Sequence, residues 1–155
     1  MRRAIAILLW LACAAAAQET PRWEGLEFLL GRWAGAGGGQ PGTGAGKFSF
    51  EAELNGQVIV RRSFNQLEKG ARHEDLLVLY ADGPNGAKRA MYWDTEGHVI
   101  RYRVSTPEVG RVVFESEGEG PGFRLSYWMA EREIKGKFEV GGKTYVEWSA
   151  KKEAE

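Results

Sequence analysis

The pattern of apolar and polar positions changes its period once along the chain. In residues 21–31, four apolar residues recur at near-helical spacing before Gly31, which predicts a short N-terminal helix. From residue 47 onward the period becomes two, as in KFSFEAEL (47–54), where apolar and polar residues alternate. Further segments of strand length and composition follow at 57–66, 74–81, 89–95, 98–105, 111–117, 123–130, 132–140 and 143–150.

Turn signals separate these segments. Asn55-Gly56, Asn85-Gly86 and Gly141-Gly142 tolerate the positive φ that tight hairpins need. The stretch DTEG (94–97) predicts a type I turn closed by a glycine bulge. With 31–38 counted as a strand, about ten short strands follow one another. The pattern therefore predicts an all-β fold, a single antiparallel up-and-down β-barrel behind a short helix.

The glycine-rich stretch GRWAGAGGGQPGTGAG (31–46) is interpreted as the entry into this barrel, followed by a loop. A phosphate-binding loop needs the pattern G-x-x-x-x-G-K-[ST] between a strand and a helix. Here Pro41 occupies the first glycine position and Phe48 the hydroxyl position, and a strand follows, so no helix N-terminus is available for an anion. Glycines instead let the first strand bend close to its neighbours. We expect Trp33 to plug the floor of the barrel.

The N-terminus has the layout of a secretory signal peptide. Two arginines precede an apolar run over 4–17 that ends in small residues and is shorter than the ~20 residues needed to span a bilayer. We therefore expect removal of 1–17, a single domain over 18–155, and export to the periplasm or the extracellular space of a bacterial-type cell. Cleavage before Cys13, as in a lipoprotein, is the alternative.

Composition and charge narrow the function classes. The chain holds 21 basic and 21 acidic residues, and loss of 1–17, which carries two arginines and no acid, leaves a net charge of −2. Because no basic block is present, we expect no nucleic-acid partner and no anionic-membrane partner. No cysteine follows residue 17, no serine stands in a G-x-S-x-G context, and no acid–base pair can be assigned. The sequence therefore assigns no catalytic residue.

The two histidines are the candidates for holding a cofactor. His73 stands beside Glu74 and Asp75, but neighbouring strand residues point to opposite faces, so only His73 and Asp75 share a side. Two ligands rarely hold zinc, and no metal site is predicted. His98 follows the 94–97 turn and is interpreted as an exposed turn residue, with a role at the mouth of the barrel as the alternative.

Aromatic residues supply the candidate ligand site. A barrel of this size is either filled by side chains or holds one small ligand. Arg62 falls in register with Val60 and Phe64, and an inward arginine needs an anionic partner or ligand. A register shift of one residue would turn Arg61 inward instead. The candidate ligand-binding residues are Trp33, Arg62, Tyr102, Phe114, Tyr127 and Trp148.

Two stretches resemble known barrels. LEFLLGRWAGAGGG (26–39) resembles the opening of calycin-type barrels: its G-x-W is shared with lipocalins, and its longer L-L-G-x-W-x-G-x-G is similar to the nitrobindin-like haem-binding family. AMYWDTEGHVIRY (90–102) resembles small bacterial lipocalin-like domains of unknown function. In the nitrobindin family a histidine near the C-terminal end of the barrel holds the haem iron. The corresponding stretch here, KTYVEWSAKKEAE (143–155), has no histidine, so a haem would need a non-standard axial ligand.

Three functions follow from the residues and the resemblance. The first is a non-catalytic carrier or sensor that holds a small, largely apolar ligand in the barrel. The second is a nitrobindin-like haem protein with isomerase activity. The third is an interaction module with a filled core that works through its surface.

Overall fold

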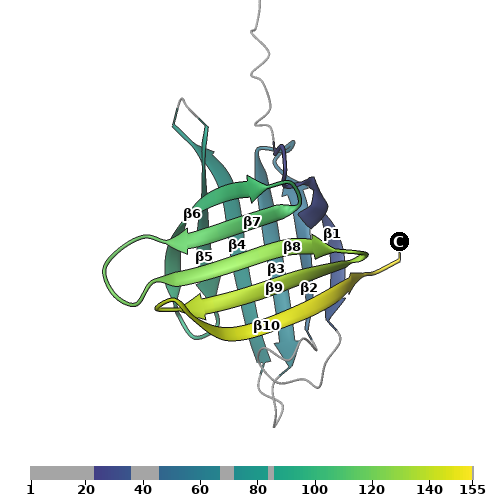
Figure 1. Cartoon of the computed structure of the whole chain (residues 1–155). Coiled ribbons are helices and arrows are strands. Elements are labelled where there is room, and N and C mark those ends of the chain that lie inside the picture. Colours follow the sequence, from purple (N-terminus) through teal and green to yellow (C-terminus); the bar gives the residue numbers. More distant parts are fainter. Residues whose placement is uncertain (1–22, 36–45, 67–71, 84–85, 155) are drawn as a thin grey trace, which may run out of the picture.

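Ten strands follow one another, and each strand pairs antiparallel with its neighbour in sequence (Figure 1). The computed structural model describes residues 23–35, 46–66, 72–83 and 86–154; the predicted signal peptide, Cys13 and residues 36–45 lie outside this part. The strands are β1 (Gly31–Gly35), β2 (Lys47–Glu53), β3 (Val58–Gln66), β4 (Arg72–Asp82), β5 (Ala87–Asp94), β6 (Val99–Glu108), β7 (Arg111–Ser116), β8 (Phe123–Ala130), β9 (Glu133–Val140) and β10 (Lys143–Lys152).

The first and last strands close the sheet into a barrel. Trp33 of β1 lies opposite Phe48 of β2 on one side and Lys152 of β10 on the other. Gly31 begins β1 with a φ of 126°, a backbone conformation that favours glycine at this entry point. The predicted antiparallel up-and-down barrel of about ten strands is therefore confirmed.

The predicted helix over 21–31 is wrong in extent. Within the described residues it is reduced to one 3-10 turn, η1 (Glu27–Leu29), because Leu30 is already extended and leads directly into β1. In a segment this short, too few helical hydrogen bonds form to offset the unfavourable free energy of helix nucleation. Its apolar residues are buried by the barrel instead, and Leu26 and Leu29 are completely inaccessible to solvent.

The segment 23–30 lies across one end of the barrel, which we call the covered end. The Trp23 indole donates a hydrogen bond to the Gly56 carbonyl in the β2–β3 turn, at 2.6 Å. The Trp33 indole donates to the Leu29 carbonyl at 2.8 Å, which confirms that Trp33 is packed at this end. The opposite end, which we call the far end, carries the β5–β6 turn and the β7–β8 connection.

The register of β3 differs from the prediction for Arg62. Arg61 is 8% exposed and faces the interior, between Phe50 of β2 and Leu77 of β4, whereas Arg62 faces outward. Arg62 pairs with the exposed Glu53, and its own side chain is 55% exposed. The prediction failed because both faces of β3 carry apolar residues, so alternation alone does not distinguish them.

Candidate functional site

An ion pair lies inside the barrel, between β3 and β4. The Arg61 guanidinium donates a hydrogen bond from Nη1 to Oδ1 of Asp75, and the two side chains are only 10% and 6% exposed. Burial by itself would lower the pKa of Arg61, but the charge of Asp75 and the smaller effects of three nearby tyrosines together outweigh burial and raise that pKa. Burial would likewise raise the pKa of Asp75, but Arg61, together with hydrogen bonds from His73 and Ser63, lowers it. Both groups are therefore ionised.

His73 extends this pair toward the far end. Its Nε2 lies 3.5 Å from Oδ2 of Asp75, and its Nδ1 lies 2.8 Å from Oε2 of Glu96 in the β5–β6 turn. The hydrogen bond to Asp75, reinforced by Glu96, raises the pKa of His73 to about 9 despite partial burial. At neutral pH a chain of alternating charges therefore runs from Arg61 through Asp75 and His73 to Glu96.

This raised pKa predicts a pH-dependent stability. The folded pKa of His73 lies above its unfolded value of 6.5, so its contribution is complete below pH 6.5 and is lost as the pH rises through about 9. We expect urea denaturation to show a free energy of unfolding that falls across this window. The His73→Gln variant should lose that fall, whereas His98→Gln should keep it. An equal fall in His73→Gln would assign the pH dependence to other groups.

Three tyrosines, Tyr92, Tyr102 and Tyr127, stand close enough to influence Arg61 electrostatically. Burial raises the pKa of Tyr127 to about 12 and raises the pKa values of Tyr92 and Tyr102 as well. The Tyr92 hydroxyl donates a hydrogen bond to Asp94 at 3.1 Å. All three phenols are therefore neutral hydrogen-bonding groups at physiological pH.

Arg61 and Tyr127 each hold a polar atom without a partner. Within the described residues, Nε of Arg61 and the hydroxyl of Tyr127 are buried and make no hydrogen bond. The guanidinium carbon of Arg61 lies 5.6 Å from the Phe48 ring centroid and 5.9 Å from that of Tyr127. Aromatic rings thus surround a buried cation that keeps one N–H group unused.

Tyr127 occupies the middle of the aromatic interior. Its ring centroid lies 5.5 Å from that of Phe50, 6.2 Å from that of Phe114 and 5.7 Å from that of Trp148. Tyr102 joins the cluster through Phe114 at 6.1 Å. Five of the predicted site residues therefore lie in the interior: Trp33, Tyr102, Phe114, Tyr127 and Trp148. Arg62 does not join them. Its place inside is taken by Arg61, the alternative that a register shift of one residue predicted, and by Asp75, which the sequence pattern did not place in the site.

His98 is an exposed turn residue, as interpreted from the sequence. Its side chain is 67% exposed, and Nδ1 lies 2.8 Å from Oδ2 of Asp94. The other oxygen of Asp94 accepts hydrogen bonds from the backbone N–H groups of Glu96 and His98, which fixes the predicted turn. Both ring nitrogens of His73 face carboxylates, and His98 lies outside the barrel. Neither histidine therefore fits as the axial ligand of an interior haem.

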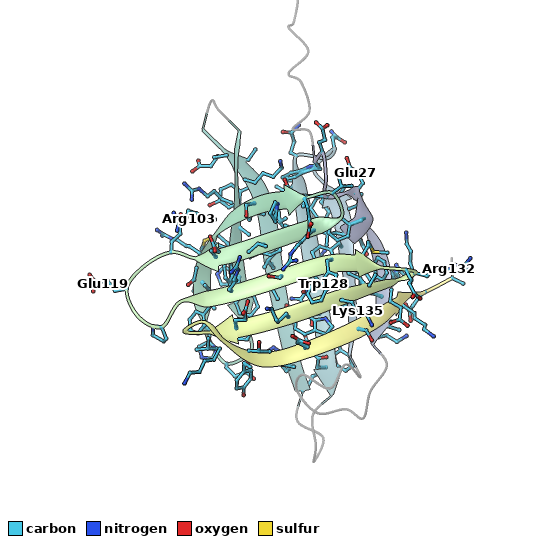
Figure 2. All side chains as sticks on the ribbon, in the orientation of Figure 1. Glu27, Arg103, Glu119, Trp128, Arg132 and Lys135 are labelled. Atoms are coloured by element: carbon cyan, nitrogen blue, oxygen red, sulfur yellow. The ribbon has the colours of Figure 1, made fainter. Side chains whose placement is uncertain are left out.

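Two hollows lie on opposite sides of the barrel. One, of about 300 Å³, is formed at the far end by the start of β6, the end of β7 and the connection that holds Glu119. Its lining includes Ile100 and Phe123, which also pack on the core. The other, of about 800 Å³, is lined mainly by charged residues around the β8–β9 turn, where Arg132 lies. Figure 2 shows Glu119 and Arg132 at these two sides. Only the first hollow adjoins the aromatic interior.

The sequence does not match any known protein family, and no curated protein is similar enough to count as a relative. Among the described residues, no helix is long and apolar enough to cross a membrane. The chain is therefore characterised by its architecture: a closed antiparallel barrel of ten strands around a buried aromatic cluster.

Proposed function

We propose that the barrel binds a small, largely apolar molecule that carries an acceptor oxygen, such as a carboxylate, and that it does so without catalysis. The observation that carries this proposal is the pair of unused donors in the interior, Nε of Arg61 and the hydroxyl of Tyr127. A buried polar group left without a partner costs about 1–3 kcal/mol. An acceptor oxygen on a ligand would remove that cost at both atoms.

The Arg61 cation favours an anionic acceptor. Arg61 and His73 are cations and Asp75 and Glu96 are anions, so the chain of four groups carries no net charge, and the preference for an anionic acceptor rests on the unused Nε–H group of the Arg61 cation. Arginine has five N–H donors in a planar fork and can hold a second acceptor beside the carboxylate it already binds. The aromatic rings of Phe48 and Phe114 would contact the apolar part of the ligand.

The far end is the proposed entrance. The segment 23–30 covers the other end, and the hollow of about 300 Å³ lies at the far end. The lining of this hollow does not include Arg61 or Tyr127, so we propose the hollow as the entrance and not as the ligand site itself. Ser116, which helps to line the hollow, is the cross-strand partner of Tyr102 in the aromatic cluster.

The resemblance of 26–39 to calycin openings supports the same function. Members of that group hold small apolar ligands inside closed barrels, and the buried Trp33 occupies the position that G-x-W predicts. We propose that the chain is such a calycin-like binder, exported after removal of 1–17. Isolation of the mature protein and determination of its N-terminal residue tests the export proposal.

Substitution of Tyr127 by phenylalanine tests the binding proposal. The Tyr127→Phe variant keeps the ring but removes the unpartnered hydroxyl, so the ligand-free protein should gain up to about 1 kcal/mol of stability. Octanoate should bind the variant about tenfold more weakly than the wild type, a difference of roughly 1.4 kcal/mol. Isothermal titration with octanoate and octanol, together with urea denaturation, measures both effects.

Tyr145→Phe is the matched control, because Tyr145 is 75% exposed and lies outside the core. It should leave both octanoate affinity and stability unchanged. Equal octanoate binding by the wild type and Tyr127→Phe, or octanol binding as tight as octanoate binding, would contradict a carboxylate held by Tyr127 and Arg61.

A further inference from the structure

Two histidines and two carboxylates meet at the β5–β6 turn of the far end. Nδ1 of His98 lies 2.8 Å from Oδ2 of Asp94, and Nδ1 of His73 lies 2.8 Å from Oε2 of Glu96. Ligand atoms of Asp94, Glu96 and His98 all lie within 4.8 Å of one another, and His73 reaches the same Glu96 carboxylate from β4. The turn therefore supplies possible metal ligands that alternation along β4 alone did not predict.

A carboxylate also holds the second ring nitrogen of His73. Nε2 lies 3.5 Å from Oδ2 of Asp75, whose side chain is 6% exposed and is paired with Arg61. A histidine that binds a metal through one nitrogen usually donates its other N–H to a carboxylate, which fixes the orientation of the ring. His73 has this support from within the barrel, independently of the acidic residues of the turn.

Asp94 divides its two oxygens between the turn and the cluster. Oδ1 accepts hydrogen bonds from the backbone N–H groups of Glu96 and His98, at 3.0 and 2.9 Å. Oδ2 remains directed at the His98 ring. The turn is also tied to β4, because the Thr95 N–H donates to the Glu74 carbonyl at 3.0 Å. The backbone thus holds the ligands of the turn beside β4.

We propose that this cluster binds a zinc ion through four ligands: Nδ1 of His73, Nδ1 of His98, Oδ2 of Asp94 and one oxygen of Glu96. Ligand atoms around a tetrahedral zinc ion lie about 3.3 Å apart, so the two contacts of 2.8 Å would each open by about half an ångström. The exposed side chains of Glu96 and His98 leave room for this movement. The two carboxylates balance the charge of the ion, and His73 releases its proton because a ligand nitrogen must be unprotonated.

The donor set selects among divalent ions. Magnesium and calcium take oxygen ligands, whereas imidazole ligands favour zinc and neighbouring transition metals. The ion would join the start of β4 to the β5–β6 turn in the folded protein, and an ion that binds the folded state stabilises it by mass action. We therefore expect zinc, but not magnesium, to raise the temperature of unfolding.

Zinc titration into the purified, metal-free chain without a histidine tag tests this proposal. The wild type should bind one zinc ion per chain. His98→Gln and His73→Gln should each weaken zinc binding at least tenfold, since even residues that only support metal ligands usually contribute roughly 10–100-fold. Glu119→Gln removes an exposed carboxylate elsewhere at the far end and is the matched control, which should bind like the wild type. Cobalt in place of zinc should give the strong visible absorption of a four-coordinate ion.

Several results would overturn the proposal. Undiminished zinc binding by His98→Gln would place the ion elsewhere, and the 67% exposure of His98 means that this variant should still fold. Equal or tighter zinc binding by His73→Gln would show that His73 is only an ion-pair partner of Glu96. The weak cobalt absorption of a six-coordinate ion, or magnesium binding as tight as zinc binding, would indicate an acidic surface without imidazole ligands. So would a wild type that binds no zinc up to ~1 mM exclude the site.

Discussion

Replacement of Arg61 by methionine is expected to lower the free energy of unfolding by about 3–5 kcal/mol, the usual cost of removing one partner of a buried ion pair. The cause is Asp75, whose side chain is only 6% exposed and which would lose the cation that keeps it ionised. His73, 3.5 Å away, would be the cation that remains beside it. Urea denaturation at pH 7 measures the change directly.

A second substitution separates the charge from the packing. In Arg61→Met/Asp75→Leu both charges are replaced by apolar groups, and most of the lost stability should return, since such exchanges are often neutral. Arg62→Met is the matched control. Arg62 pairs with Glu53 at the exposed surface, and its loss should cost no more than about 1 kcal/mol. A cost for Arg61→Met as small as that for Arg62→Met would show that the interior pair does not hold Asp75 ionised.

The acid dependence of Arg61→Met follows from the same argument. Without the guanidinium, burial favours the protonated form of Asp75, so protonation relieves much of the penalty. The deficit relative to the wild type should therefore be smaller at pH 4 than at pH 7. A deficit that does not change with pH would point to lost packing rather than to an unpaired carboxylate.

The barrel could be predicted because the signals for it lie within single strands and single turns of the sequence. Alternation of period two and glycine-containing turns such as Asn55-Gly56 and Gly141-Gly142 fix where strands begin and end, and consecutive strands joined by short turns pair with one another. The helix over 21–31 failed for the opposite reason. Its apolar spacing is helical, but the burial of Leu26 and Leu29 against the barrel end decides its conformation, and that contact is not local.

The sequence of β3 by itself could not predict the interior ion pair. In β3, Val58 and Val60 on the outer face are as apolar as Ile59 on the inner face, so the pattern gives no reason to prefer Arg61 over Arg62. The information lies on the neighbouring strand. Asp75 has the same parity as the buried Leu77 and Leu79, and an inward carboxylate requires a cation on an adjacent strand. Comparison of β3 with β4 would therefore have selected Arg61.

Replacement of Gly136 by alanine, which adds a single methyl group, is the second substitution that we expect to lower the free energy of unfolding strongly. A Cβ atom at this position of β9 would lie closer than 3.0 Å to three atoms of the Trp148 indole, its cross-strand neighbour. The indole cannot simply move away, because Tyr127 stands against it with ring centroids 5.7 Å apart. Gly136→Ala should therefore cost about 2–3 kcal/mol, near the upper range for overpacking, measured by urea denaturation.

Two comparisons show whether the loss of stability in Gly136→Ala arises from contact with the Trp148 indole. Gly122→Ala is the matched control, because a Cβ atom there meets nothing within 4 Å, and it should be neutral or slightly stabilising. In a Trp148→Leu background the smaller side chain leaves room for the methyl group, so Gly136→Ala should cost much less than in the wild type. An equal cost in both backgrounds would mean that β9 itself, rather than contact with Trp148, requires glycine. A reduced cost would show that Gly136 is what allows Trp148 to lie against Tyr127, beside the unpartnered hydroxyl at the centre of the proposed binding site.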